Sequence, residues 1–150
     1  MARVAIDPHM FGELWFNAVR EELIKSGSVR FAYSRLLKEG MELSKQRAAL
    51  QFFKQVGEIK RRDDAHEETC KRFCEALLTE PAWGEHRKVC DDAHLFSLVR
   101  TLPTEFVFSK DVRMAKCRDC LNGKVEAGYL RFSLISSEAL FRKRKHDILS

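Results

Sequence analysis

Short apolar runs alternate along the chain with stretches whose apolar residues recur every three or four positions. Residues 4–6 are a continuous apolar run, residues 106–109 are apolar up to Ser109, and residues 29–33 alternate between apolar and other side chains. Runs of this length and pattern are typical of strands in a sheet. Residues 56–60 and 130–135 are two further strand candidates.

The stretches between these strands have the spacing of one helix face. Ser34 is an expected N-cap, and so are Asp63 or Asp64 and Asp91 or Asp92 for two later helices. The first three predicted helices cover residues 10–24, 34–45 and 47–54. The fourth runs from Asp63 or Asp64 to the break at residues 80–84, and the fifth from Asp91 or Asp92 to Pro103. The sixth covers residues 112–121 and is ended by Asn122-Gly123.

Strands that alternate with helices predict an α/β protein, with a mostly parallel central sheet and helices on both of its faces. A chain of 150 residues is long enough for one such domain with a single core. We therefore expect one domain over residues 1–141, followed by a basic C-terminal tail over residues 142–150.

The amino-acid composition favours a globular protein and argues against a membrane-spanning or secreted one. The 45% hydrophobic and 33% charged content is that of a globular protein, and the net charge of +5 suits a polyanionic partner. The apolar runs are far shorter than a membrane span, and the opening residues lack the apolar segment of a secretory signal. Five cysteines without the spacing of a disulfide scaffold predict buried free thiols in a reducing cytoplasm.

Four acidic residues, Asp7, Glu39, Asp92 and Asp111, stand where a strand is predicted to end or a helix to begin. The carboxyl ends of parallel strands meet at the crevice in which α/β folds bind ligands. Carboxylates gathered there repel one another unless a cation joins them, and hard oxygen ligands suit Mg²⁺ or Mn²⁺. The pattern predicts metal-dependent phosphodiester chemistry.

Residues 90–98 followed by 107–111 resemble the PIN-domain nucleases, in which an acidic-Asp-X-His helix start precedes an apolar strand ending in Ser-X-Asp. Residues 4–7 are similar to the family's opening strand and first aspartate, and the Ser34 helix with Glu39 is similar to its second acidic position. The likeness runs from about residue 4 to 135. It implies a PIN-like three-layer sandwich and hydrolysis of a phosphodiester, usually in RNA.

The resemblance also implies roles for single residues. Asp7 and Asp92 would bind the metal directly, and Asp111 and Glu39 would complete its surroundings. Ser109 would hydrogen-bond a carboxylate, a bound water or the scissile phosphate. Glu42, three residues after Glu39 on nearly the same helix face, is an alternative second acid. Water is the nucleophile in such a site.

Basic residues next to the acids are candidate contacts to RNA phosphates: Arg35, Lys38, Lys110 and Arg113. The compact single domain suits the toxin of a toxin–antitoxin pair. By resemblance to the family we expect an RNA substrate, a possible antitoxin partner and a homodimer. The short apolar runs predict no membrane partner.

Other interpretations stay open. The sequence Asp7-Pro8-His9 departs from the family's Asp-X-Asn or Asp-X-Ser, which favours a catalytically weak PIN-like RNA-binding or scaffold protein, and a DNA nuclease is a third possibility. Asp92 alone would be an N-cap, Asp111 a turn residue, and Asp63 and Asp64 capping or solvated residues. The CxxC spacing of residues 117–120 suggests zinc, with buried thiols as the alternative.

Overall fold

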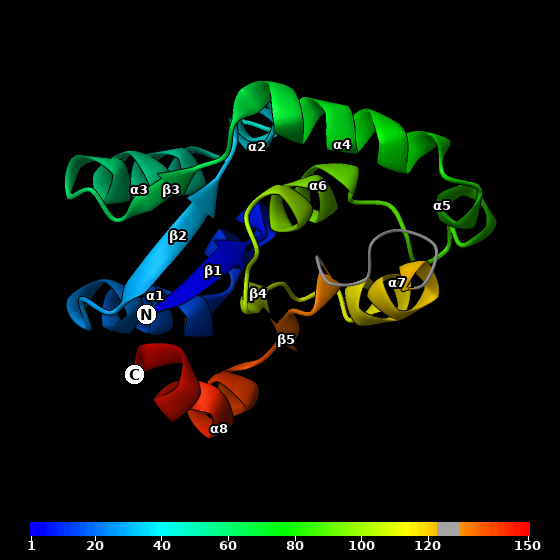
Figure 1. Ribbon diagram of the computed structural model, residues 1–150. Coiled ribbons are helices and arrows are strands. Elements are labelled where there is room, and N and C mark those ends of the chain that lie inside the picture. The colour runs from blue at the N-terminus through cyan, green and yellow to red at the C-terminus, as the bar shows by residue number, and fades with distance from the viewer. Residues whose placement is uncertain (123–129) are drawn as a thin grey trace.

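The computed structural model describes residues 1–122 and 130–150. Its five strands form one sheet in the order β3-β2-β1-β4-β5, and every neighbouring pair is parallel (Figure 1). The strands are β1 (Ala2–Ile6), β2 (Val29–Tyr33), β3 (Arg62–Asp64), β4 (Phe106–Phe108) and β5 (Ser133–Ile135). The predicted α/β fold with a parallel central sheet is confirmed.

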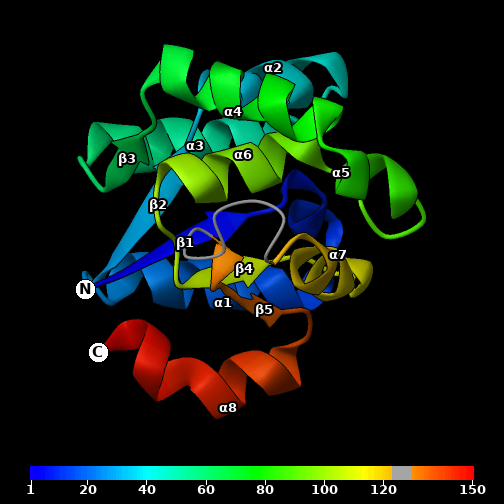
Figure 2. The same cartoon turned by 45° about the vertical axis from the view of Figure 1, so that its right-hand side comes forward.

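Helices cover both faces of this sheet, as predicted, and give three layers (Figures 1 and 2). The helices α1 (Leu14–Lys25), α3 (Arg47–Glu58) and α8 (Glu138–Leu149) lie on one face. The other face is covered by α6 (Ala93–Thr101), with α4 (Glu67–Thr79) packed outside it. The remaining elements are η1 (Pro8–Gly12), α2 (Arg35–Leu43), α5 (Pro81–Glu85) and α7 (Arg113–Leu121). This layering is consistent with a PIN-like sandwich.

Side-chain alternation gives the two faces of the sheet different surfaces. On the α1 and α3 face, Phe31 of β2 packs on Phe52 with ring centroids 5.1 Å apart, and Phe108 of β4 packs on Phe16 at 5.6 Å. On the α6 face the strands present small residues, such as the fully buried Ala5 and Ala32. Large rings on one face and alanines on the other set how closely each helix layer approaches.

Several predicted boundaries are wrong. Residues 56–58 continue α3, because Ala49, Phe52, Phe53 and Val56 extend its buried face, and the edge strand is β3 instead. His66, and not Asp63 or Asp64, caps α4 through the Thr69 N–H.

Two other boundaries move as well, and a third lies where it was predicted. The predicted helix over residues 10–24 is divided into η1 and α1, and β5 is shorter than the run 130–135 that predicted it. At the predicted helix stop, Asn122 is the C-cap of α7, and Gly123 lies outside the described residues.

The residues expected to form a basic tail lie within α8, which begins at Glu138 and is capped by Ser137. Phe141 and Ile148, seven positions apart, are both fully buried. Arg142 and Lys145 form ion pairs with Glu22 of α1, and hydrogen bonds from Lys145 and Arg142 lower the pKa of that carboxyl. The C-terminal segment is therefore part of the α1 layer. Among the described helices, none combines the length and apolarity that a membrane crossing needs.

Candidate functional site

The strand order reverses beside β1, because the chain runs from β1 to β2 and β3 on one side and later returns to β4 and β5 on the other. Such a switch point opens a crevice at the carboxyl ends of the strands. Asp7 follows β1 and Ser109 follows β4 at this place, and the Asp7 N–H donates to the Phe108 carbonyl over 2.8 Å. The topology thus brings residues about a hundred positions apart to one edge.

Asp7 is held rigidly in this crevice. It is 6% exposed, and its Oδ2 accepts a hydrogen bond from the Ser109 hydroxyl at 2.8 Å. Its Oδ1 accepts from the His9 N–H at 3.0 Å. The Ser109 hydroxyl also accepts from the Asp111 N–H at 3.1 Å, so this one side chain connects the ends of β1 and β4.

Asp92 lies at the N-cap of α6, where one carboxylate oxygen accepts from the Leu95 N–H at 3.1 Å. Burial raises the pKa of this carboxyl to about 6; the Leu95 hydrogen bond opposes that rise, and the charge of Asp7 adds to it. The expected capping role is thus present. A desolvated carboxylate beside a second carboxylate goes beyond what capping requires.

Asp7 and Asp92 line the same cavity, which has a volume of about 130 Å³ and is called the acidic pocket below. His9, His94 and Gln46 contribute to its wall, and the Gln46 amide lies 3.4 Å from His9 Nδ1. One face of α2, at the spacing i, i+3, i+4, i+7, completes it with Leu37, Gly40, Met41 and Ser44.

The two acids predicted on α2 lie away from this face. Glu39 lines a separate cavity of about 90 Å³ together with Arg35, Glu67 and Cys70. Glu42 is paired with Lys38 at 3.7 Å. Neither glutamate lines the acidic pocket.

Asp111 is near the crevice but is engaged by a cation. Arg113 donates to its two carboxylate oxygens, each at 2.9 Å, and these hydrogen bonds lower the pKa of Asp111. The same guanidinium donates to Asp91 at 2.9 Å and to the Lys88 carbonyl at 3.1 Å. Arg113 therefore binds acidic groups of two segments at once.

The other predicted phosphate contacts are paired as well. Arg35 lies 3.2 Å from Glu67, and Lys110 lies 3.3 Å from Glu13. Together with the Lys38–Glu42 pair and the Arg113 contacts, all four candidate cations face a carboxylate of this chain.

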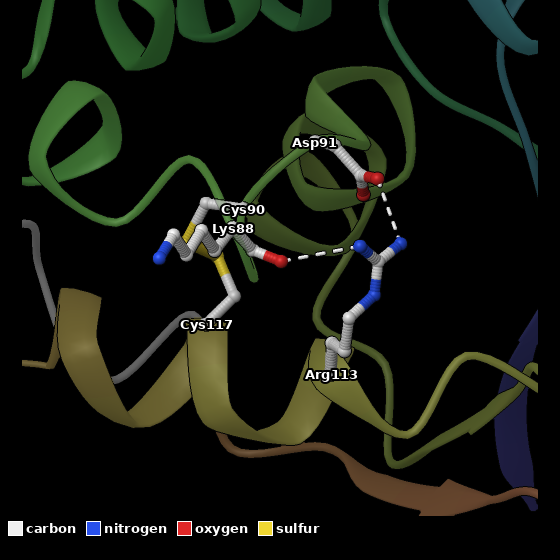
Figure 3. Close-up of a disulfide and its surroundings, with 5 residues drawn as sticks. All are labelled: Lys88, Cys90, Asp91, Arg113 and Cys117. Carbon is white, nitrogen blue, oxygen red and sulfur yellow. Dashed lines mark hydrogen bonds and ion pairs between the residues drawn. A yellow bond between two sulfur atoms is a disulfide. The ribbon is translucent and has the colours of Figure 1, made fainter.

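A disulfide between Cys90 and Cys117 joins the segment that carries Asp92 to α7 (Figure 3). Arg113 lies beside it, pointing toward Asp91 and Lys88, so a covalent link and an ion-pair network fasten the same two segments. The prediction of free thiols throughout is wrong for these two cysteines, while Cys70 and Cys74 are buried thiols as expected. Because Cys117 is oxidised in this disulfide, it cannot act as a thiolate ligand. The CxxC pair of Cys117 and Cys120 therefore does not supply two thiolates for zinc.

The donor set of the acidic pocket fits a hard divalent cation. Two desolvated carboxylates that repel each other gain from a cation between them, and Mg²⁺ is commonly held by one or two carboxylates with water completing its shell. In residues 1–122 and 130–150 there is no group of three or more His, Cys, Asp or Glu side chains arranged to hold a metal.

No family model, no curated protein and no solved structure matches this chain. The site is therefore defined by its own geometry. The sequence prediction did not assign His94 and Gln46 to the pocket wall. The signal in the sequence that identifies the inward face of α2 is the i, i+3, i+4, i+7 spacing of Leu37, Gly40, Met41 and Ser44.

Proposed function

We propose that this protein is a metal-dependent phosphodiesterase, and most specifically a ribonuclease, which acts at the acidic pocket. The observation that carries the proposal is the pairing of Asp7 and Asp92. They are 85 positions apart, yet they share one cavity at the switch point of a parallel sheet. Burial raises the pKa of Asp92 to about 6 and the charge of Asp7 adds to the rise, a cost that binding a cation would remove.

Asp7 and Asp92 are the residues that would hold Mg²⁺ or Mn²⁺. Bound there, such an ion supplies Lewis acidity toward a phosphoryl oxygen and acidifies a bound water. The chain supplies orientation: Ser109 and the His9 N–H fix the carboxylate of Asp7, and the Leu95 N–H fixes that of Asp92. Leu37 and Met41 contribute apolar side chains to the wall of the same pocket.

The biological setting follows from the resemblance to PIN-domain nucleases. We expect an RNA substrate, a toxin role with an antitoxin that covers the acidic pocket, and a homodimer. Light scattering of the purified chain tests the dimer. Copurification with the product of an adjacent reading frame tests the antitoxin.

The test of the reaction is cleavage of a mixed pool of single-stranded and structured RNAs with Mg²⁺, Mn²⁺ or EDTA. Metal-dependent cutting by the wild type that is lost in Asp92→Asn supports the proposal. Calorimetric titration with Mn²⁺ provides an independent readout, because Asp92→Asn should weaken binding. Absence of both cutting and metal binding would overturn it.

A second candidate function is a nucleic-acid-binding protein that hydrolyses little or nothing. It is favoured by the positions of the other two acids: Arg113 neutralises Asp111, and Glu39 lines a different cavity. Under this hypothesis Asp7→Ala leaves RNA affinity unchanged or higher, and neither protein cuts RNA in Mn²⁺. Cutting by the wild type alone excludes it.

A further inference from the structure

Two further cavities follow the acidic pocket along α3. It shares Pro8, His9 and Gln46 with a groove of about 270 Å³ between η1 and the start of α3. That groove shares Ala48 with a cavity of about 250 Å³ between α1 and α3. The shared residues place the three cavities next to one another along α3, and the two outer cavities together are called the α3 groove.

The α3 groove presents cations and amides. Arg47 lines the part next to the acidic pocket, and Arg20 lines the far part. The amide side chains along it are Gln46, Gln51 and Gln55, and Glu21 is a carboxylate at its far end. Guanidinium and amide groups are the side chains that proteins commonly direct at phosphate and sugar oxygens.

These two arginines differ from the cations beside the acids. Arg35, Lys38, Lys110 and Arg113 each form an ion pair with a carboxylate. Over the part of the chain that the structure describes, Arg20 and Arg47 form no such pair. A guanidinium without a carboxylate partner has its charge available for an anion from outside the chain.

The floor of the α3 groove consists of packed rings. Phe11 and Phe52 are the rings that line it; their centroids lie 5.1 Å apart, Phe52 is 4% exposed and Phe11 is half-buried. The Arg20 guanidinium lies over Phe11, 5.5 Å from its centroid, which holds that cation in place. Because Phe52 is buried and the Arg20 guanidinium lies over Phe11, the groove is suited to contacts with a backbone rather than to stacking of bases.

We propose that the α3 groove binds the phosphodiester backbone of single-stranded nucleic acid next to the bond held in the acidic pocket, an inference that rests on the function proposed above. Arg47 contacts the phosphate nearest the acids and Arg20 one farther along. From Arg47 to Gln55, α3 extends about 12 Å at its usual rise per residue. The two cavities, of about 270 and 250 Å³, have the size of small-molecule sites, which suits a few nucleotides of one strand.

The test is binding of a fluorescent single-stranded RNA of mixed sequence, measured by anisotropy in EDTA so that no metal-dependent cutting occurs. Arg47→Ala should weaken binding about fivefold and reduce the slope of log affinity against log salt by about 0.7, the share of one phosphate contact. Arg47→Lys keeps the charge and should restore most of that slope.

The matched control is Lys54→Ala, which removes an exposed cation from the same helix outside the lining of the groove. Equal affinities of the Arg47→Ala and Lys54→Ala proteins would overturn the proposal. A DNA of the same sequence should show the same loss, and a loss on RNA alone would overturn the phosphate contact. Cleavage in Mn²⁺ is scored separately, so failure of the nuclease function and failure of the groove are distinguishable.

Discussion

Asp63 and Asp92 are both partly withdrawn from solvent, but the charges around the two carboxylates have opposite signs. Asp63, the second residue of β3, has a side chain that is 18% exposed and accepts hydrogen bonds from Arg3 Nε at 3.0 Å and Arg30 Nε at 2.9 Å. Asp92 lies at the carboxyl edge of the sheet in the same cavity as Asp7. One acid is compensated by two arginines, and the other faces a second acid.

Their pKa values move in opposite directions. Burial alone would raise the pKa of Asp63, but the hydrogen bonds from Arg30 and Arg3 outweigh it and lower that pKa. Burial raises the pKa of Asp92 to about 6, and Asp7 adds to the rise. A charge compensated within the chain stabilises the sheet. A charge left uncompensated costs stability, and that cost is recovered when a cation from outside binds.

The largest expected effect tests the uncompensated acid. Asp92→Asn should reduce metal-dependent cleavage at least about 100-fold, because one of the two metal-binding carboxylates is lost. Asparagine caps helices as well as aspartate does, so α6 should keep its start. Initial rates on RNA in Mn²⁺ measure the effect. The matched control is the neighbouring Asp91→Asn, which removes an exposed acid paired with Arg113 and should keep most of the activity.

The second prediction concerns the covalent link beside that acid. The Cys90–Cys117 bond closes a loop with a sequence separation of 27, and its loss should lower the free energy of unfolding by about 3 kcal/mol. Urea unfolding with and without a thiol reductant measures this. The double variant Cys90→Ser with Cys117→Ser should be equally unstable and insensitive to reductant. An unchanged urea midpoint for the reduced wild type would contradict the pairing.

Much of the fold is predictable because the central strands are continuous apolar runs that can be recognised in the sequence. Val4 to Ile6 and Phe106 to Phe108 are apolar on both faces, which only a buried strand requires. The edge strand β3 has no such signal, since Arg62, Asp63 and Asp64 are all charged. It is held by ion pairs to β1 and β2, which are long-range contacts that periodicity does not encode.

The third prediction tests the compensated acid. Asp63→Asn should destabilise the protein by about 2 kcal/mol, because Arg3 and Arg30 then face each other without the carboxylate between them. Thermal or urea unfolding measures the loss, and cleavage should be unchanged below the melting transition. Asp119→Asn, which removes the acid of the exposed pair with Arg118, is the control and should change stability by less than about 0.5 kcal/mol.

The sequence predicted two of the residues that line the acidic pocket, Asp7 and Asp92, but not the face of α2 that completes it. Asp7 and Asp92 directly follow or precede elements whose direction the sequence indicates, so topology brings them together. Glu39 was placed by its distance from the Ser34 cap, whereas the inward face of α2 is set by Leu37 and Met41. The Arg113 contacts with Asp111 and Asp91 depend on a loop conformation that no local pattern in the sequence indicates.

The smallest effect expected is a difference in pH dependence between the same two acids, measured in EDTA. Because the folded-state pKa of Asp92 is raised from 3.8 to about 6, the folded chain binds this proton more tightly than the unfolded chain. Wild-type stability should therefore fall relative to Asp92→Asn as pH rises from about 4 through 6, leaving the variant more stable by about 1–2 kcal/mol at pH 7.

Asp63 works in the opposite direction. Its pKa is lowered, so its contribution is complete at neutral pH and is lost as pH falls through the folded-state pKa. At neutral pH the wild type should be more stable than Asp63→Asn and less stable than Asp92→Asn. Both differences in the free energy of unfolding should become smaller as the pH is lowered. Urea unfolding of the three proteins across this pH range measures both. Parallel curves for wild type and Asp92→Asn would contradict the raised pKa, and with it the claim that the acidic pocket stores an uncompensated charge.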